Sequence, residues 1–228
     1  MKLATIVLLG ILLLGSFASM QAADPAGAGQ VAMAFSGGSV YTSDTAGICM
    51  WYPLLLGDFN MEFLFEFVDG APAVDKEHAY LIWVSDFSSM AQGSFTLPPS
   101  SKGLLTLQLV PTGVGTIYFT DVPRLRNWKD LTDRTTWGKP VARFVRQAGI
   151  FLSADGGMSG GMTNSAVLTS STPFTLGGKT FDFKDLMPHG MTCFETGFSG
   201  TTSKKDKKNN DDGGDDEAGT CIAIGPAK

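Results

Sequence analysis

Apolar residues alternate with polar ones along much of this chain, and this period of two predicts β-strands. No window of ten residues shows the 3.6-residue period of an amphipathic helix. The strand-like runs, rich in β-branched and aromatic residues, are 79–87, 93–99, 104–111, 115–121, 141–152 and 220–225. Regularly spaced strands with turn signals between them predict an all-β, single-domain antiparallel sandwich, with a barrel as the alternative.

Two segments predict more local geometry. Between Phe59 and Phe67, five apolar side chains occupy alternate positions, which predicts a continuous strand with one wholly apolar face. The run FTLGGKTFDF at 174–183 predicts a β-hairpin, because Gly177 and Gly178 can adopt the positive φ angles of a two-residue turn.

The N-terminus has the layout of a cleavable secretory signal. A single lysine precedes an apolar or small run over residues 3–18, and small residues follow at Ala22 and Ala23. This run is shorter than the roughly 20 residues that span a bilayer. We therefore expect a signal peptide at 1–23, a single mature domain at 24–228 without a membrane span, and a secreted or periplasmic location.

The composition favours a packed core, since 43% of the residues are hydrophobic and 17% are charged. Residues 203–219 differ from the rest because they contain many charges and no large apolar side chain. Such a segment has nothing to bury that would offset the entropy lost on ordering its backbone. It predicts a mobile charged loop near the C-terminus.

Three cysteines suggest one disulfide in an oxidising compartment. Cys193 and Cys221 flank the charged loop, so a bond between them would tie its base if the two segments are neighbouring strands. Cys49 would then be a free thiol buried among apolar residues. Pairing of Cys49 with either of the other two is the alternative.

The charge distribution singles out residues 121–147. They contain all five arginines and have a net charge of +4, whereas the rest of the mature chain has a net charge of −10. So acidic a chain is not expected to bind nucleic acid or anionic membranes. The local basic region favours an anionic or carbohydrate ligand, or a protein partner.

Arginine and tryptophan side chains within this region form the candidate site. Guanidinium groups suit carboxylate, sulfate or phosphate, and an indole ring offers a face on which a sugar can stack. The predicted ligand-binding residues are Arg124, Arg126, Trp128, Arg134 and Trp137. The alternative is structural: Asp130 and Asp133 would pair with Arg126 and Arg134, while the tryptophans pack beneath them.

A catalytic alternative rests on residues 157–161, GMSGG, which match the G-x-S-x-G pattern of serine hydrolases. Ser159 would be the nucleophile, with Asp185 and His189 following in the usual order. This chemistry needs a strand-to-helix turn at the serine and a nearby general base. The residues after Ser159 make a poor helix, so a flexible glycine-rich connection explains the pattern equally well.

A copper-handling alternative rests on Met187, His189, Met191 and Cys193, which occupy every second position. On an extended segment all four would face one way, and thioether, imidazole and thiolate ligands suit copper. A proline and a glycine within the segment favour a turn instead. Cys193 is also expected in the disulfide.

The favoured interpretation is a non-catalytic binding or envelope-associated module for an anionic or glycan-like ligand. The serine hydrolase and the copper-handling protein are its alternatives. No cofactor and no metal are expected, because no nucleotide-binding, dinucleotide-binding or zinc-finger motif occurs.

Overall fold

The computed structural model describes residues 28–43, 46–88, 91–96, 106–109, 113–154, 159–199 and 215–225. The predicted signal peptide and residues 203–214 of the predicted loop lie outside these ranges. The expected all-β class is confirmed, since the one α-helix among the described residues is α1 (Phe183–Leu186). No helix in this described part is both long enough and apolar enough to cross a membrane.

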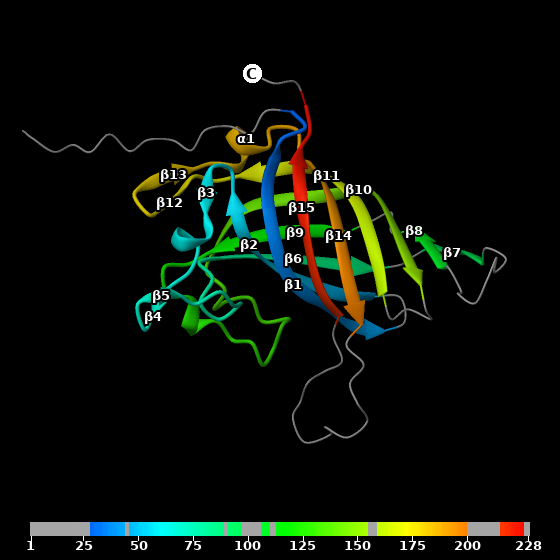
Figure 1. The fold of residues 1–228 in the computed structure, drawn as a ribbon, viewed down its shortest axis with the longest axis horizontal. Coiled ribbons are helices and arrows are strands. Elements are labelled where there is room, and N and C mark those ends of the chain that lie inside the picture. Colours follow the sequence, from blue (N-terminus) through cyan, green and yellow to red (C-terminus); the bar gives the residue numbers. More distant parts are fainter. Residues whose placement is uncertain are drawn as a thin grey trace, which may run out of the picture.

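Eight strands form a closed antiparallel barrel (Figure 1). They are β1 (Val31–Ser43), β2 (Ala46–Leu56), β6 (Leu81–Ser88), β9 (Val114–Phe119), β10 (Lys139–Ala154), β11 (Ser159–Ser171), β14 (Met191–Ser199) and β15 (Asp215–Ala223). Each pairs with the next, and β15 returns to pair with β1. The sandwich prediction is therefore wrong and the barrel alternative is confirmed. Closure gives each of these strands two hydrogen-bonded neighbours, which removes the exposed edges of an open sheet.

Strand β10 is long enough to serve two neighbours in succession. Its first part, Lys139 to Val145, pairs with β9 as part of the barrel wall. Its last part pairs with β8 (Thr106–Leu109), which in turn pairs with β7 (Ala91–Thr96). These two strands therefore extend the sheet outward from the barrel (Figure 1).

Three connections, 57–80, 120–138 and 172–190, meet at one end of the barrel, here called the loop-rich end. The register places them together, because Leu56, Leu81, Phe119, Lys139 and Met191 all lie at this end of their strands. The short elements there are β3 (Phe59–Asn60), η1 (Met61–Phe63), β4 (Phe67–Val68), β5 (Ala71–Pro72), η2 (Pro123–Leu125), β12 (Phe174–Leu176), β13 (Lys179–Phe181) and α1. The candidate site residues lie on these connections.

The continuous strand predicted over 59–67 is wrong. The chain turns through the 3-10 helix η1 after β3, and β4 and β5 form a hairpin across Asp69 and Gly70, whose φ angles are 52° and 84°. Phe65 is buried, whereas Phe67 is 59% exposed. The Asp-Gly pair is a turn signal that overrides the alternation, since both residues tolerate positive φ.

Two predictions about turns have different outcomes. The hairpin at 174–183 is confirmed, with Gly177 and Gly178 at φ angles of 57° and 79° between β12 and β13. The predicted loop 203–219 extends too far, because β15 begins at Asp215. Residues 215–219 pair with both β1 and β14, so backbone hydrogen bonds order a segment that has little to bury.

An aromatic layer fills the barrel interior. Phe35 and Trp51 stack with ring centroids 4.4 Å apart, Trp51 and Trp83 lie 5.7 Å apart, and Trp83 and Phe144 lie 5.0 Å apart. Glycine on the neighbouring strand β9 makes room for the Trp83 ring. A Cβ atom on Gly115 would lie 2.2 Å from the Trp83 ring, so only glycine fits there.

The disulfide between Cys193 and Cys221 is confirmed. The two residues lie directly opposite each other on β14 and β15, with Cα atoms 3.9 Å apart. Cys49 is free and buried, as predicted. Its surroundings are more polar than predicted, since the Ser39 hydroxyl lies within hydrogen-bond distance of its sulfur, at 3.0 Å.

Candidate functional site

Arg126 binds backbone carbonyls rather than Asp130, the partner that the structural alternative predicted. Its guanidinium donates to the carbonyl oxygens of Ala79, Tyr80 (3.0 Å) and Trp137 (3.3 Å). The side chain is buried, and burial lowers its pKa to about 10. Arg126 therefore joins the connection 57–80 to the connection 120–138, and it offers no open edge to a ligand.

Arg134 and Asp133 do not form the local pair that the same alternative predicted. Arg134 makes two hydrogen bonds to the carboxylate of Asp86 on β6. Asp130 and Asp133 instead accept hydrogen bonds from the backbone and hydroxyl groups of the threonines two residues later. These are local turns of the kind that aspartate stabilises.

The two tryptophans of the predicted site differ in exposure. Trp137 is 0% exposed and packs against Tyr118 and Trp128, with centroid distances of 6.0 and 5.3 Å. Trp128 is half-buried, and Lys76 Nζ lies 5.5 Å over its ring. Trp137 therefore belongs to the core, whereas Trp128 presents a ring face near solvent.

A groove of about 630 Å³ lies at the loop-rich end. It is lined by Glu77, His78, Arg124, Arg126, Asn127, Trp128 and Lys129. Three of the five predicted site residues thus meet here, while Arg134 and Trp137 do not line the groove. Arg124 is exposed and contacts Glu66 through Nε at 2.7 Å, and Lys129 is exposed. Sequence reasoning missed Lys129, Asn127 and the 57–80 connection, which supplies the opposite wall.

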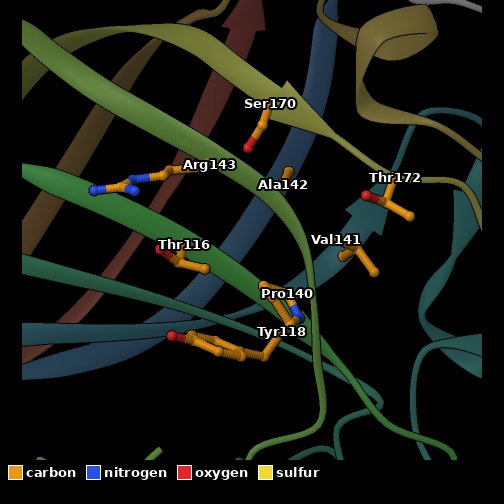
Figure 2. Close-up of a pocket in the computed structure, with 8 residues that line it drawn as sticks. All are labelled: Thr116, Tyr118, Pro140, Val141, Ala142, Arg143, Ser170 and Thr172. Carbon is orange, nitrogen blue, oxygen red and sulfur yellow. The ribbon is translucent and has the colours of Figure 1, made fainter.

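A second hollow, of about 400 Å³, lies on the outer wall where β10 is irregular (Figure 2). Thr116, Tyr118, Arg143 and Ser170 line it from three neighbouring strands. Arg143 is exposed on this wall and belongs to neither the groove nor the barrel interior. It therefore offers a matched control for variants of the other arginines.

The hydrolase alternative does not fit the geometry. Ser159 begins strand β11 and pairs with both β10 and β14, so it lacks the strand-to-helix turn of a nucleophile. His189 precedes Met191, which pairs with Ala166 at the other end of β11. Seven residues of strand, about 23 Å, separate Ser159 from that point.

The copper alternative fails because the four residues do not share a face. Met187 and Met191 are fully buried, His189 is exposed, and Cys193 is disulfide-bonded. The chain turns between Met187 and Met191. Among the described residues, no group of three or more histidine, cysteine, aspartate or glutamate side chains is placed to hold a metal.

A polar belt lines the barrel interior, one step beyond the aromatic layer and away from the loop-rich end. The side chains of this belt come from seven of the eight barrel strands. On its own strand, each lies two residues from another residue that faces inward, so it faces inward too. The members are Ser39, Cys49, Ser85, Arg146, Asn164, Glu195 and Glu217. Glycines lie opposite both glutamates, which leaves room for their side chains.

Sequence reasoning missed the polar belt, although one signal could have found it. The predicted bond between Cys193 and Cys221 fixes the register of two strands. With a period of two, Glu195 and Glu217 then fall on the same face as the disulfide. A buried disulfide therefore implied two inward-facing glutamates.

The electrostatics of the belt favour neutral forms at two positions. Burial, and then the charge of Glu217, raise the pKa of Glu195 well above its usual value, while Arg146 opposes this effect. Burial and Glu217 also raise the pKa of the Cys49 thiol. Glu217 itself accepts hydrogen bonds from Trp51 Nε1 (2.6 Å) and from the Ser39 hydroxyl. Burial therefore favours the neutral thiol of Cys49 and the protonated carboxyl of Glu195.

Replacing Glu195 with glutamine is expected to remove a pH-dependent loss of stability. Because the folded-state pKa of Glu195 is raised, its contribution is fully present below the unfolded value near 4.5 and is lost as the pH rises through the folded value. A tenfold difference in proton affinity between the folded and unfolded states corresponds to about 1.4 kcal/mol of stability. Urea unfolding from pH 4 to 8 should show E195Q overtaking the wild type as the pH rises. Glu77→Gln, at an exposed position, should follow the wild type; parallel curves for E195Q would contradict the assignment.

Comparison of the chain with protein-family models, with curated proteins and with solved structures gives no match.

Proposed function

We propose that this protein is an exported, non-catalytic binding module that takes an anionic, sugar-like ligand in the groove at Trp128. The observation that carries the proposal is the placement of a half-buried indole between two exposed cations, Arg124 and Lys129, in a groove of about 630 Å³. Aromatic faces bind sugar rings, and guanidinium and ammonium groups bind their carboxylate or sulfate substituents.

The residues that pack inward support this groove. The hydrogen bonds of Arg126 hold its two walls together, and Trp137 packs against Trp128. A binding ring held by packed neighbours loses little entropy when a ligand docks. Four of the five sequence-predicted residues thus divide into ligand contacts, Arg124 and Trp128, and their support, Arg126 and Trp137. The fifth, Arg134, contacts Asp86 outside the groove.

A ligand would displace Lys76 from the exposed face of Trp128. An exposed cation–π contact is worth about 0.5–1 kcal/mol, so the displacement costs little. Glu66 engages Arg124 through Nε and, more weakly, through one terminal nitrogen, which leaves the remaining edge of the guanidinium for an anion.

The test is calorimetric titration with tetragalacturonate, with neutral maltotetraose as the control ligand. We expect tetragalacturonate to bind, to bind more weakly at 150 mM than at 20 mM salt, and to bind more tightly than maltotetraose. Trp128→Ala, and the pair Arg124→Gln with Lys129→Gln, should each weaken binding by about tenfold, the equivalent of 1.4 kcal/mol.

Arg143→Gln removes an exposed arginine outside the groove and should leave the affinity unchanged. If this control and the groove variants lost affinity for tetragalacturonate equally, the loss would come from the change in net charge alone. Absence of binding, or affinities unaffected by Trp128→Ala, would sink the proposal.

A further inference from the structure

We propose that the polar belt inside the barrel is a second binding site, which holds the carboxylate group of a small organic acid. Arg146, Asn164, Glu195 and the indole of Trp83 would contact the carboxylate. This site is independent of the groove, because it lies in the barrel interior beyond the aromatic layer, and its residues come from β6, β10, β11 and β14.

The first observation is a set of buried polar atoms without partners. Glu195 Oε2, Asn164 Nδ2 and Trp83 Nε1 have no hydrogen-bond partner among the residues that the structure describes. The three residues are 6%, 3% and 4% exposed. A buried polar group left unpaired destabilises the folded state, and native interiors pair nearly all of them. Three such groups in one interior indicate that a further polar molecule completes them.

The second observation is that these groups converge. Asn164 lies opposite Cys193, so Glu195 is its diagonal neighbour across β11 and β14. Arg146 lies opposite Ala166, which places it diagonally from Asn164 on the other side. Diagonal neighbours are about 7–8 Å apart, within reach of long side chains.

The indole of Trp83 reaches the same level from β6, which is separated from β10 by β9 alone. Its ring covers Gly115, which lies opposite Ser85 of the belt. Arg146 reaches this strand as well, because its guanidinium carbon would lie 3.6 Å from a Cβ atom on Gly113. The three unpaired groups and Arg146 therefore lie on the inner faces of four strands, β6, β10, β11 and β14.

The chemistry of these groups selects an acceptor. Asn164 Nδ2 and Trp83 Nε1 can only donate, and Arg146 is a cation with five donors. Burial and the charge of Glu217 raise the pKa of Glu195, which favours its protonated carboxyl, and that form also donates. The oxygens of Glu217 already accept from Trp51 and Ser39. A carboxylate supplies acceptors for these unpaired donors and a second anionic partner for the Arg146 guanidinium, whereas a cationic ligand would supply neither.

The neighbouring aromatic layer selects the rest of the ligand. Trp83 and Phe144 precede Ser85 and Arg146 by two residues on the inward faces of β6 and β10, so apolar rings adjoin the belt. A carboxylate bound at Arg146 would place its apolar body against these rings. The site therefore fits an acid with a compact apolar or aromatic body.

The experiment titrates the full mature chain with benzoate, benzyl alcohol and benzylamine, followed by tryptophan fluorescence and calorimetry. We expect benzoate to bind at least tenfold more tightly than either analogue. Its affinity should fall as the pH rises through the raised pKa of Glu195, because that carboxyl then loses the donated proton and becomes negative beside the bound carboxylate. Glu217, Arg146 and the Cys49 thiol are the other charged or titratable groups that face it.

Two variants test the contacts, with circular dichroism as the check of folding. Arg146→Gln and Asn164→Leu should each weaken benzoate binding at least tenfold, whereas Arg143→Gln, on the outer wall of the same strand, should not. If Arg146→Gln does not fold, the benzoate affinity of Asn164→Leu and the pH dependence of benzoate binding to the wild type decide whether the polar belt is the site. Absence of benzoate binding, preference for benzylamine, or affinity indifferent to pH and to Asn164→Leu would overturn the proposal.

Discussion

Arg126→Met is expected to lower the free energy of unfolding by about 2–4 kcal/mol. The substitution removes three hydrogen bonds from a cation to backbone carbonyls, and bonds to charged groups contribute about 1.5–3 kcal/mol each. The carbonyl of Tyr80 keeps a second donor, the backbone amide of Thr120, whereas the carbonyls of Ala79 and Trp137 lose the donor that Arg126 supplies.

The opposing effect is relief from burying a charge. Burial lowers the pKa of Arg126 to about 10, so the protein bears a cost for keeping this guanidinium inside. Replacing a buried ion by an apolar residue regains that cost. We expect the hydrogen bonds to dominate, because methionine leaves carbonyls of two separate connections without their donor.

The measurement is urea unfolding at pH 7, with Arg143→Met as the matched control. Arg143 is exposed, so its substitution should change the stability by no more than about 0.5 kcal/mol. Arg126→Lys retains the charge but not the planar fork, and it should fall between the wild type and Arg126→Met. A stability of Arg126→Met equal to that of the control would show that the three bonds contribute nothing net.

Removing the disulfide should cost about 3–4 kcal/mol. Cys193 and Cys221 are 28 residues apart, and closing a loop of this length removes that much conformational free energy from the unfolded chain. The bond also joins the two strands that present Glu195 and Glu217 to the interior. We therefore expect the double variant Cys193→Ala with Cys221→Ala to unfold at lower urea concentration.

A reductant distinguishes this effect from a packing defect. It should lower the stability of the wild type and of Cys49→Ala to similar extents, and it should leave the double variant unchanged. Cys49→Ala alone should cost less, about 1 kcal/mol, because it removes one small buried group. Insensitivity of the wild type to complete reduction would contradict the prediction.

The candidate site illustrates where sequence reasoning reached its limit. The arginine-rich segment lies beside a groove, and the sequence singled it out because charge and tryptophan content are properties of the chain itself. The partners of its arginines were not foreseen. Arg124 contacts Glu66, Arg134 contacts Asp86, and Arg126 contacts backbone of the 57–80 connection. Each partner lies 46 or more residues away, whereas a sequence suggests only local pairs.

The sequence by itself determined the β class and the hairpin at Gly177 and Gly178, and it favoured the pairing of Cys193 with Cys221 over the two alternatives. Each follows from local information: a period of two, a turn dipeptide, or the scarcity of cysteines. The strands β1 and β11 escaped prediction because they are rich in glycine, serine and threonine. These small residues fit the interior and the surface of a barrel, but they are weak sequence signals of a strand.

Only the tertiary structure decided between sandwich and barrel. Closure depends on pairing the first barrel strand, β1, with the last, β15, and alternation reveals which face a residue occupies but not which strand lies beside it. The polar belt arises for the same reason. Its seven members are scattered singly over seven strands, and they become one layer only when the sheet closes on itself.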